Sequence, residues 1–158
     1  MAEKASVLIL AGSKNDLQEL EKTTAVLEKL GIPFAVKVAS AHRTPDDVVR
    51  TVQEHTAGTA RVIIAAAGLA NHLAGAAAAR TVCPVIGVPL AKPPLNGLDA
   101  LLSTVQMPPG VPVATVGIGA AENAAILAAE ILGVSDSQIR KKLLKQREDL
   151  RRSILGGS

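Results

Sequence analysis

The segment Phe34-Ala35-Val36-Lys37-Val38-Ala39-Ser40-Ala41-His42-Arg43-Thr44-Pro45 reads as a strand, a polar loop and the start of a helix. Residues 34–39 are typical of a strand, and Pro45 after Thr44 is a helix-start signal. Such junctions build parallel α/β sheets, which bind ligands at the carboxyl ends of their strands. His42 and Arg43 therefore lie where a ligand would bind, although a capped loop with two solvated side chains also fits this pattern.

The same alternation of strand and helix recurs along the chain. We expect strands at 6–11, 34–39, 62–67, 85–88 and 113–116, and helices at 17–30, 46–55, 71–80, 98–105 and 121–132. The helix at 17–30 carries Leu17, Leu20, Thr24 and Leu27 on one face, and Gly31 and Gly133 stand where two helices would end. Because the strand at 6–11 is continuously apolar and the five strands alternate with helices, the sequence predicts a three-layer α/β/α fold whose parallel sheet is covered on both faces.

The composition predicts one domain with a core of small aliphatic residues. The chain has 158 residues, 48% of them hydrophobic, with one Phe and neither Tyr nor Trp. We treat residues 1–158 as a single domain with a core at 6–134. The alanine-rich helices allow close packing and suggest faces buried between subunits. Stacking on nucleic-acid bases is nearly excluded, because Phe34 is the only aromatic ring that could supply it.

The segment from 135 to about 154 predicts a charged C-terminal helix. Ser135 and Asp136 can cap it, and Ile139, Leu143 and Leu150 form a narrow apolar stripe suited to a neighbouring surface. Residues 135–158 hold seven Lys/Arg and three Asp/Glu, a net charge of +4, against −1 for the rest of the chain. A nucleic-acid or anionic-membrane contact is the alternative, but acidic residues at 148–149 interrupt the basic face. We expect no nucleic-acid and no membrane partner.

Cysteine usage and the chain ends indicate a soluble cytoplasmic protein. The single Cys83 cannot form an intramolecular disulfide and reads as an apolar residue in a buried strand. The first four residues show no signal-peptide pattern, and the apolar runs are too short to span a membrane. Residues 156–158 look disordered.

Three loops at predicted strand ends carry polar chemistry: 12–16, 40–45 and 68–73. In the first, Ser13 could donate to a phosphate oxygen and Asp16 could accept from ribose hydroxyls, although both also fit as plain helix caps. The third holds His72, which could be catalytic or merely structural. The three His and one Cys lack metal-ligand spacing, so we expect no metal. Together the loops indicate a phosphorylated, sugar-bearing ligand and one histidine placed for proton transfer.

Five motifs together resemble one enzyme family in order and spacing: Gly12-Ser13-Lys14-Asn15-Asp16, Ser40-Ala41-His42-Arg43-Thr44-Pro45, Ala67-Gly68-x-Ala70-x-His72-Leu73, Leu95-Asn96-Gly97-Leu98-Asp99 and Val105-Gln106-Met107-Pro108. This is the PurE family of purine biosynthesis, which contains N5-carboxyaminoimidazole ribonucleotide mutases, and the resemblance covers about residues 6–134. It implies a flavodoxin-like fold, a homo-octamer with active sites at subunit junctions, and a reaction without ATP, metal or organic cofactor.

The resemblance also implies a role for each matching residue. His42 would be the general acid/base that protonates the departing nitrogen and later removes the C4 proton. The implied substrate-binding residues are Ser13, Ser40 and Arg43 for the phosphate, Asp16 for the ribose, and Gly68, Ala70, Asn71, His72 and Leu73 for the base and its carboxylate or CO2. Dry walls would suit a reaction that must retain CO2.

Departures from the family pattern leave the substrate open. They are Asn15, Leu69, Asn71, Ala74 and the run Lys92-Pro93-Pro94. Asn71 is typical of a second class, which carboxylates aminoimidazole ribonucleotide directly with CO2, whereas Arg43, His72 and residues 95–108 favour the mutase. We expect the mutase, and the alternatives are the direct carboxylase and a non-catalytic ribonucleotide-binding module.

Overall fold

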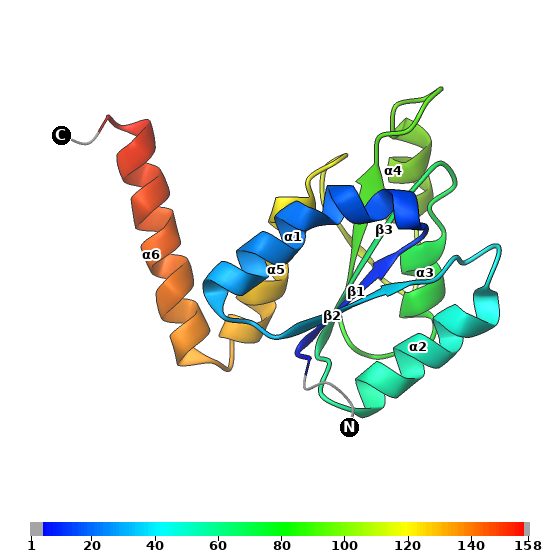
Figure 1. Cartoon of the computed structure of the whole chain (residues 1–158), viewed down its shortest axis with the longest axis horizontal. Helices are drawn as coiled ribbons and strands as arrows, with labels where there is room; N and C mark the ends of the chain where they lie inside the picture. Colours follow the sequence, from blue (N-terminus) through cyan, green and yellow to red (C-terminus); the bar gives the residue numbers. More distant parts are fainter. Residues whose placement is uncertain (1–4, 157–158) are drawn as a thin grey trace.

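A five-stranded parallel sheet lies between two layers of helices in the computed structural model, which describes residues 5–156 (Figure 1). The strands are β1 (Val7–Ala11), β2 (Phe34–Val38), β3 (Val62–Gly68), β4 (Val85–Leu90) and β5 (Ala114–Thr115). Their order is β2-β1-β3-β4-β5, and every neighbouring pair is parallel. The predicted α/β/α fold is confirmed. Our expectations for the first four residues and for 157–158 lie outside the described residues.

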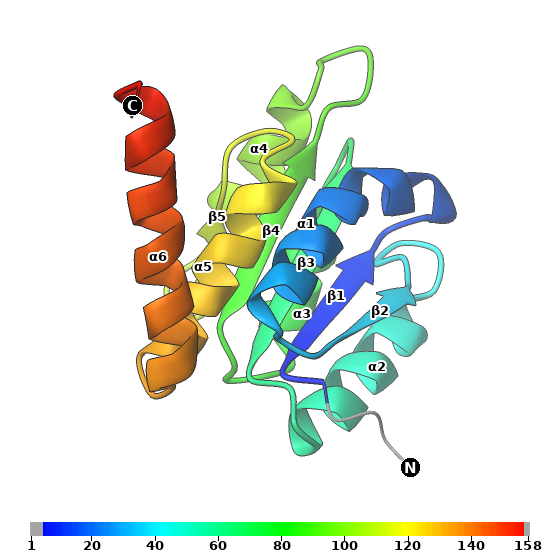
Figure 2. The ribbon, with the colours of Figure 1, turned by 60° about the vertical axis from the view of Figure 1, so that its left-hand side comes forward.

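Helices cover both faces of this sheet (Figure 2). On one face lie α1 (Leu17–Leu30), preceded by the short turn η1 (Lys14–Asp16), and α5 (Ala121–Gly133); on the other lie α2 (Pro45–Ala57), α3 (Leu73–Ala78) and α4 (Leu98–Val105). The strand order turns in opposite directions on the two sides of β1. In such sheets, ligands bind outside the carboxyl ends of the strands at this switch point.

The continuously apolar sequence of β1 follows from its central position. Val7 and Ile9 pack in the core beneath α1 and α5, whereas Leu8 and Leu10 pack against α2 and α3. All four side chains are fully buried, because successive residues of a strand point to opposite faces and both faces are covered. The sheet therefore holds the loops at its carboxyl edge on a rigid base.

Small residues bring α1 and α5 close together. Ala124, Ala125 and Ala128 of α5 are fully buried, and Thr23 Oγ1 of α1 donates a hydrogen bond of 2.8 Å to the Ala121 carbonyl. Our prediction that Thr24 lies on the buried face of α1 was wrong, since Thr24 points outward and bonds within its own helix. Helical spacing allows a step of either three or four residues, and packing against α5 selects Thr23.

Some predicted boundaries differ from the structure. Gly133 is the last residue of α5 rather than its terminator, and there it lies close to Leu143 of the next helix. Cys83 is half-buried in the loop before β4, not in a buried strand. β4 continues to Leu90 through Pro89; β5 pairs only with Ile86 and Gly87, so no ladder bond to β5 requires an N–H at Pro89.

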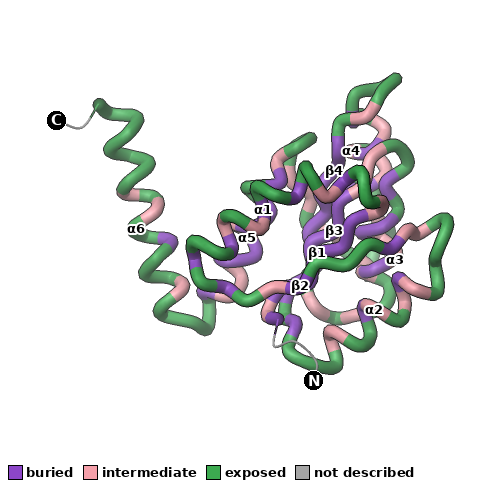
Figure 3. Tube along the Cα trace, viewed as in Figure 1, coloured by how far each residue is buried: buried purple, intermediate pink, exposed green. Residues whose placement is uncertain are grey.

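The C-terminal helix α6 (Ser137–Ile154) packs on the body through its first half, and Arg147 adds an ion pair with Glu130 of α5. Asp136 caps it as predicted, because Oδ1 accepts from the N–H groups of Gln138 at 2.8 Å and Ile139 at 3.1 Å. Leu143 is buried against α5, but the apolar residues toward the C-terminus are exposed (Figure 3). The helix therefore extends beyond the sheet with an apolar stripe that its own chain leaves uncovered.

Candidate active site

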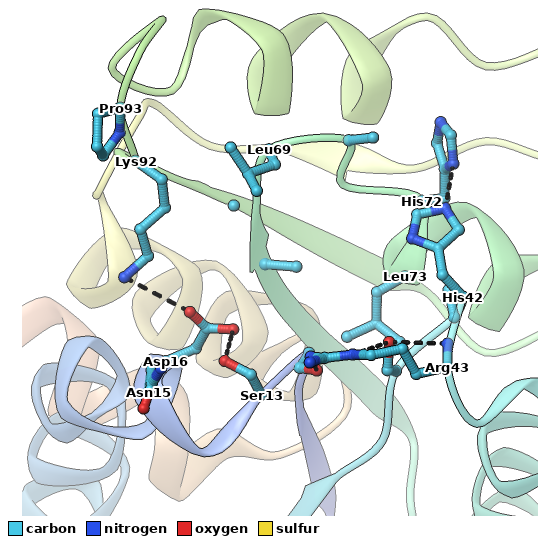
Figure 4. Close-up of a pocket in the computed structure, with 16 residues that line it drawn as sticks. Ser13, Asn15, Asp16, His42, Arg43, Leu69, His72, Leu73, Lys92 and Pro93 are labelled. Carbon is cyan, nitrogen blue, oxygen red and sulfur yellow. Dashed lines mark hydrogen bonds and ion pairs between the residues drawn. The ribbon is translucent and has the colours of Figure 1, made fainter.

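A cavity of about 590 Å³ opens at the carboxyl edge of the sheet, where the loops after β1, β2, β3 and β4 converge (Figure 4). Its lining consists of Gly12, Ser13, Asn15, Asp16, Ser40, Ala41, His42, Arg43, Ala67, Gly68, Leu69, Ala70, His72, Leu73, Lys92 and Pro93. Every site residue that we predicted from the sequence is among these except Asn71. The fold thus brings together the three predicted loops, which are remote in the sequence, and adds the loop after β4.

Arg43 and Ser40 form one corner of the cavity. The backbone N–H and the Nε of Arg43 both donate to Ser40 Oγ, at 3.2 and 3.4 Å, and Nη2 donates to the Gly12 carbonyl at 3.3 Å. Arg43 thus connects the loop after β2 to the loop after β1. Its partners are neutral, so its positive charge is available to a ligand phosphate.

A second cluster joins Ser13, Asp16 and Lys92. Ser13 Oγ donates to Asp16 Oδ2 at 2.8 Å, and Lys92 Nζ lies 3.6 Å from Asp16 Oδ1. Neither Ser13 nor Asp16 caps a helix with its side chain, so the interpretation of these residues as plain caps is wrong. A nearly buried carboxylate that the helix does not use can accept hydrogen bonds from a ligand.

The third cluster is a pair of histidines. His42 Nε2 lies 2.8 Å from His72 Nδ1, and the two rings meet edge to face with centroids 4.9 Å apart. Such a contact needs one proton between the two nitrogens, so one ring donates and the other accepts. Each ring is therefore held in place by its hydrogen bond to the other.

The loop after β3 places its residues on two sides. Asn71 is fully buried beneath the cavity, where its backbone N–H donates to Ser103 Oγ at 2.9 Å and Nδ2 donates to the Val88 carbonyl at 3.3 Å. Leu69 lines the cavity with a positive φ of 56°, which favours glycine. The side-chain amide of Asn71 thus bonds to β4, its backbone bonds to α4, and the residue does not line the cavity.

Lys92 and Pro93 belong to the cavity but were not among our predicted site residues. From the sequence alone, Lys92 and Arg80 could each be an anion partner or a solvated charge. The structure places Lys92 in the cavity, whereas Arg80 is exposed and does not line it. Its position in the sequence could have identified Lys92 as a site residue. It follows the strand β4, and the loop after β4 emerges at the same edge of the sheet as the other three cavity loops.

Residues 5–156 contain no group of three or more His, Cys, Asp or Glu side chains arranged to hold a metal ion. Over the same range, every helix is too short or too polar to cross a lipid bilayer.

Comparison with known proteins places the chain in a family. Residues 6–153 match the family model described as AIR carboxylase. The chain is 53% identical over 149 residues to the N5-carboxyaminoimidazole ribonucleotide mutase of Methanocaldococcus jannaschii, covering 94% of this chain and 92% of that protein. It is 48% identical over 153 residues to the mutase of Pseudomonas aeruginosa, covering 96% and 94%.

A solved structure supports the same assignment. The crystal structure of Treponema denticola PurE superposes with a TM-score of 0.88 at 31% identity and covers 95% of this chain and 94% of that one. The family model spans nearly all of the sheet, the four cavity loops and α6. The chain therefore belongs to the AIR carboxylase family.

Proposed function

We propose that the chain converts N5-carboxyaminoimidazole ribonucleotide to 4-carboxyaminoimidazole ribonucleotide, a step of de novo purine biosynthesis. The observation that carries the proposal is the hydrogen-bonded pair of His42 and His72 in a cavity that is also lined by Arg43. The mutase names of relatives about half identical to this chain support it.

Each cavity cluster takes one part of the substrate. Arg43 and Ser40 hold the 5′-phosphate, since they supply a guanidinium and a hydroxyl group. Ser13 contributes a backbone N–H at the start of the next helical turn, because its hydroxyl donates to Asp16 Oδ2. Asp16 accepts hydrogen bonds from the ribose. The remaining predicted residues that line the cavity contact the base and its carboxylate: Gly68, Ala70, His72 and Leu73.

The reaction exchanges a proton and CO2 between two atoms of the substrate. The C–N bond of the N5-carboxylate breaks, CO2 is released into the cavity, and His42 supplies the proton that the nitrogen retains. C4 then attacks CO2 to form the new C–C bond, and His42 removes the C4 proton to restore the aromatic ring. His42 gives one proton to the nitrogen and regains one from C4, so it ends the reaction in its starting protonation state. General acid/base catalysis of this kind contributes about 10²- to 10⁴-fold in rate.

His72 supports this cycle through its contact with His42. If both rings carried two protons, two N–H groups would face each other across 2.8 Å, so the intact pair holds at most one extra proton. That capacity matches the single proton that the reaction borrows and returns.

The position of Asn71 bears on the choice between mutase and direct carboxylase. The sequence signal for direct carboxylation rests on this asparagine, yet its amide hydrogen-bonds to the Val88 carbonyl beneath the cavity. Asn71 is also absent from the residues that line the cavity. We therefore favour the mutase.

We further propose that the enzyme is a cytoplasmic homo-octamer. His42 and His72 are exposed in the isolated chain, although the reaction must retain CO2. Four apolar side chains before and along α4 and four along or just after α6 are also exposed: Leu95, Leu98, Leu102 and Val105, and Leu144, Leu150, Ile154 and Leu155. Neighbouring subunits that cover these faces could close the cavity.

The test compares two substrates. Purified protein is assayed with N5-carboxyaminoimidazole ribonucleotide and, separately, with aminoimidazole ribonucleotide plus bicarbonate. Faster conversion of the first, independent of bicarbonate, supports the mutase, and use of the second alone would make the protein a direct carboxylase. Binding of the ribonucleotides without turnover of either would make it a non-catalytic ribonucleotide-binding module.

A further inference from the structure

We infer that Lys92 is a positioning residue that orients the Asp16 carboxylate toward the ribose hydroxyls of the substrate. The inference rests on the proposed function and extends it to a side chain in the loop after β4. It concerns how the sugar is recognised and leaves the histidine chemistry unchanged.

The aliphatic part of the Lys92 side chain occupies the space above Gly68, which has no side chain of its own. A Cβ built on Gly68 would lie 2.3 Å from Lys92 Cγ and 3.3 Å from its Cβ, so the aliphatic chain crosses Gly68 where any other residue would displace it. The side chain is 30% exposed, which is low for a lysine in a surface loop. Figure 4 shows the stem descending from the loop toward Asp16.

Lys92 and Ser13 act on different oxygens of one carboxylate. Ser13 Oγ donates to Oδ2 at 2.8 Å, and Lys92 Nζ lies 3.6 Å from Oδ1. Two partners on opposite oxygens restrain rotation of the carboxylate about its Cβ–Cγ bond. Each oxygen has a second lone pair, so both can still accept from ligand hydroxyls.

The charges in the cavity assign Lys92 to the sugar and not to the phosphate. Within residues 5–156, Arg43 forms no ion pair, and its guanidinium bonds only to neutral oxygens. The ammonium of Lys92 already faces a carboxylate whose side chain is 7% exposed. Arg43 is thus the cation left for a phosphate, and Lys92 compensates the nearly buried charge of Asp16.

The test measures sugar recognition separately from catalysis. Binding of ribose 5-phosphate and 2-deoxyribose 5-phosphate to the full-length protein is measured by calorimetry. We expect the wild type to bind the ribose compound about tenfold more tightly, the value of a hydrogen bond to a charged acceptor. Lys92→Met should bring the two affinities within about threefold of each other, mainly by weakening the ribose compound.

Five further variants, one of them a control, test whether Lys92 acts through Asp16. Asp16→Asn should lower the ratio in the same way, and Asp16→Asn/Lys92→Met should lower it no further, because Lys92 acts through Asp16. Gly68→Ala should reproduce the effect while retaining the lysine, since the new Cβ displaces its stem. Lys92→Arg should recover much of the ratio, and Lys22→Met, an exposed lysine of α1, is the matched control.

Kinetics separate positioning from a folding defect. With the ribonucleotide substrate, Lys92→Met should raise KM and leave kcat within about twofold of the wild type. Equal loss of both sugar phosphates would assign Lys92 to the phosphate and overturn the inference, as would an unchanged ratio or additive effects with Asp16→Asn. If the wild type converts neither ribonucleotide, the proposed function fails, and the sugar-phosphate ratio still decides the role of Lys92.

Discussion

His42 and His72, 30 residues apart in the chain, meet with Nε2 and Nδ1 2.8 Å from each other. They follow β2 and β3, which are not neighbours in the sheet, because β1 lies between them. The contact therefore forms above the end of β1, at the switch point of the strand order. Both loops must be correctly placed for the pair to exist, and it connects the second and third cavity loops.

His42→Asn should abolish turnover and leave ribonucleotide binding nearly intact. Asparagine keeps a polar side chain of similar length but cannot accept and return a proton at neutral pH, so kcat should fall by about 10²- to 10⁴-fold. Turnover is measured with N5-carboxyaminoimidazole ribonucleotide and binding by calorimetry. His55→Asn, on α2 and outside the cavity, is the control. Turnover that survives His42→Asn would remove His42 from the acid/base role.

His72→Ala should lower kcat by about tenfold, the value of one hydrogen bond to a group that becomes charged. Because the two rings act as a unit, His42→Asn/His72→Ala should be no slower than His42→Asn alone. Steady-state kinetics of the three variants measure this non-additivity. Multiplicative losses would show that the two histidines act independently.

Arg43→Met should weaken substrate binding more than catalysis. The change removes the cation of the anion corner and its bond to the Gly12 carbonyl, so KM should rise about ten- to hundredfold with a smaller change in kcat. Inhibition by inorganic phosphate should be lost in parallel. Arg80→Met, which removes an exposed arginine outside the cavity, should change neither. Normal phosphate inhibition in Arg43→Met would place the phosphate elsewhere.

Most of the fold could be predicted because β1, β3 and β4 are local apolar runs, and because helical segments alternate with the strands. The helix at 17–30 and its cap at Gly31 are confirmed, since a glycine with φ 67° ends that helix. Burial of Thr23 instead of Thr24 could not be predicted, because it depends on how α5 packs against α1. Local sequence determines an element, and packing determines its rotation.

Most cavity residues could be predicted because their side chains, such as those of His42 and Arg43, have functional groups in loops that follow strands. Placing Asn71 in the cavity followed from its position beside His72, but the chain turns after Leu69 and the two side chains diverge. The role of Lys92 depends on the space above Gly68, a tertiary relation between different loops. The contact of His42 with His72 likewise requires the strand order, which no single motif contains.

Leu69→Gly should leave stability unchanged or raise it, although it removes a large side chain. Leu69 adopts a φ of 56° and is 51% exposed, so it carries backbone strain of about 1–2 kcal/mol with limited burial in return. Glycine relieves that strain, at an entropy cost of about 0.5–1 kcal/mol. Urea denaturation measures the balance, with Leu73→Gly, in a buried helical position, as a strongly destabilising comparison. A loss above about 1 kcal/mol for Leu69→Gly would mean that the side chain packs more tightly than its exposure indicates.

Leu150→Lys/Ile154→Lys should dissociate the assembly without unfolding the subunit. The two side chains are 58% and 73% exposed near the C-terminal end of α6, beyond the ion pair of Arg147 with Glu130, so the isolated chain loses little by their replacement. In an octamer that buries this stripe, two lysines would place unpaired charges in an apolar interface, at a cost of several kcal/mol each. Light scattering after size exclusion should show smaller species, and circular dichroism should be unchanged.

Enzyme activity tests whether the assembly also covers the exposed pair of His42 and His72. If neighbouring subunits close the cavity, dissociation of Leu150→Lys/Ile154→Lys should also reduce turnover, because CO2 escapes before C4 captures it. Ser153→Lys adds a charge on the same exposed turn outside the stripe and should keep both the assembly and the activity. Truncation after Gly133 should likewise break the assembly. The truncation also removes the basic helix α6. If the full chain binds nucleic acid in a salt-sensitive way and the truncated chain does not, the nucleic-acid role of α6 is supported instead. A dissociated double variant with full activity would show that one chain retains CO2 by itself, and an intact octamer would place the interface on another face.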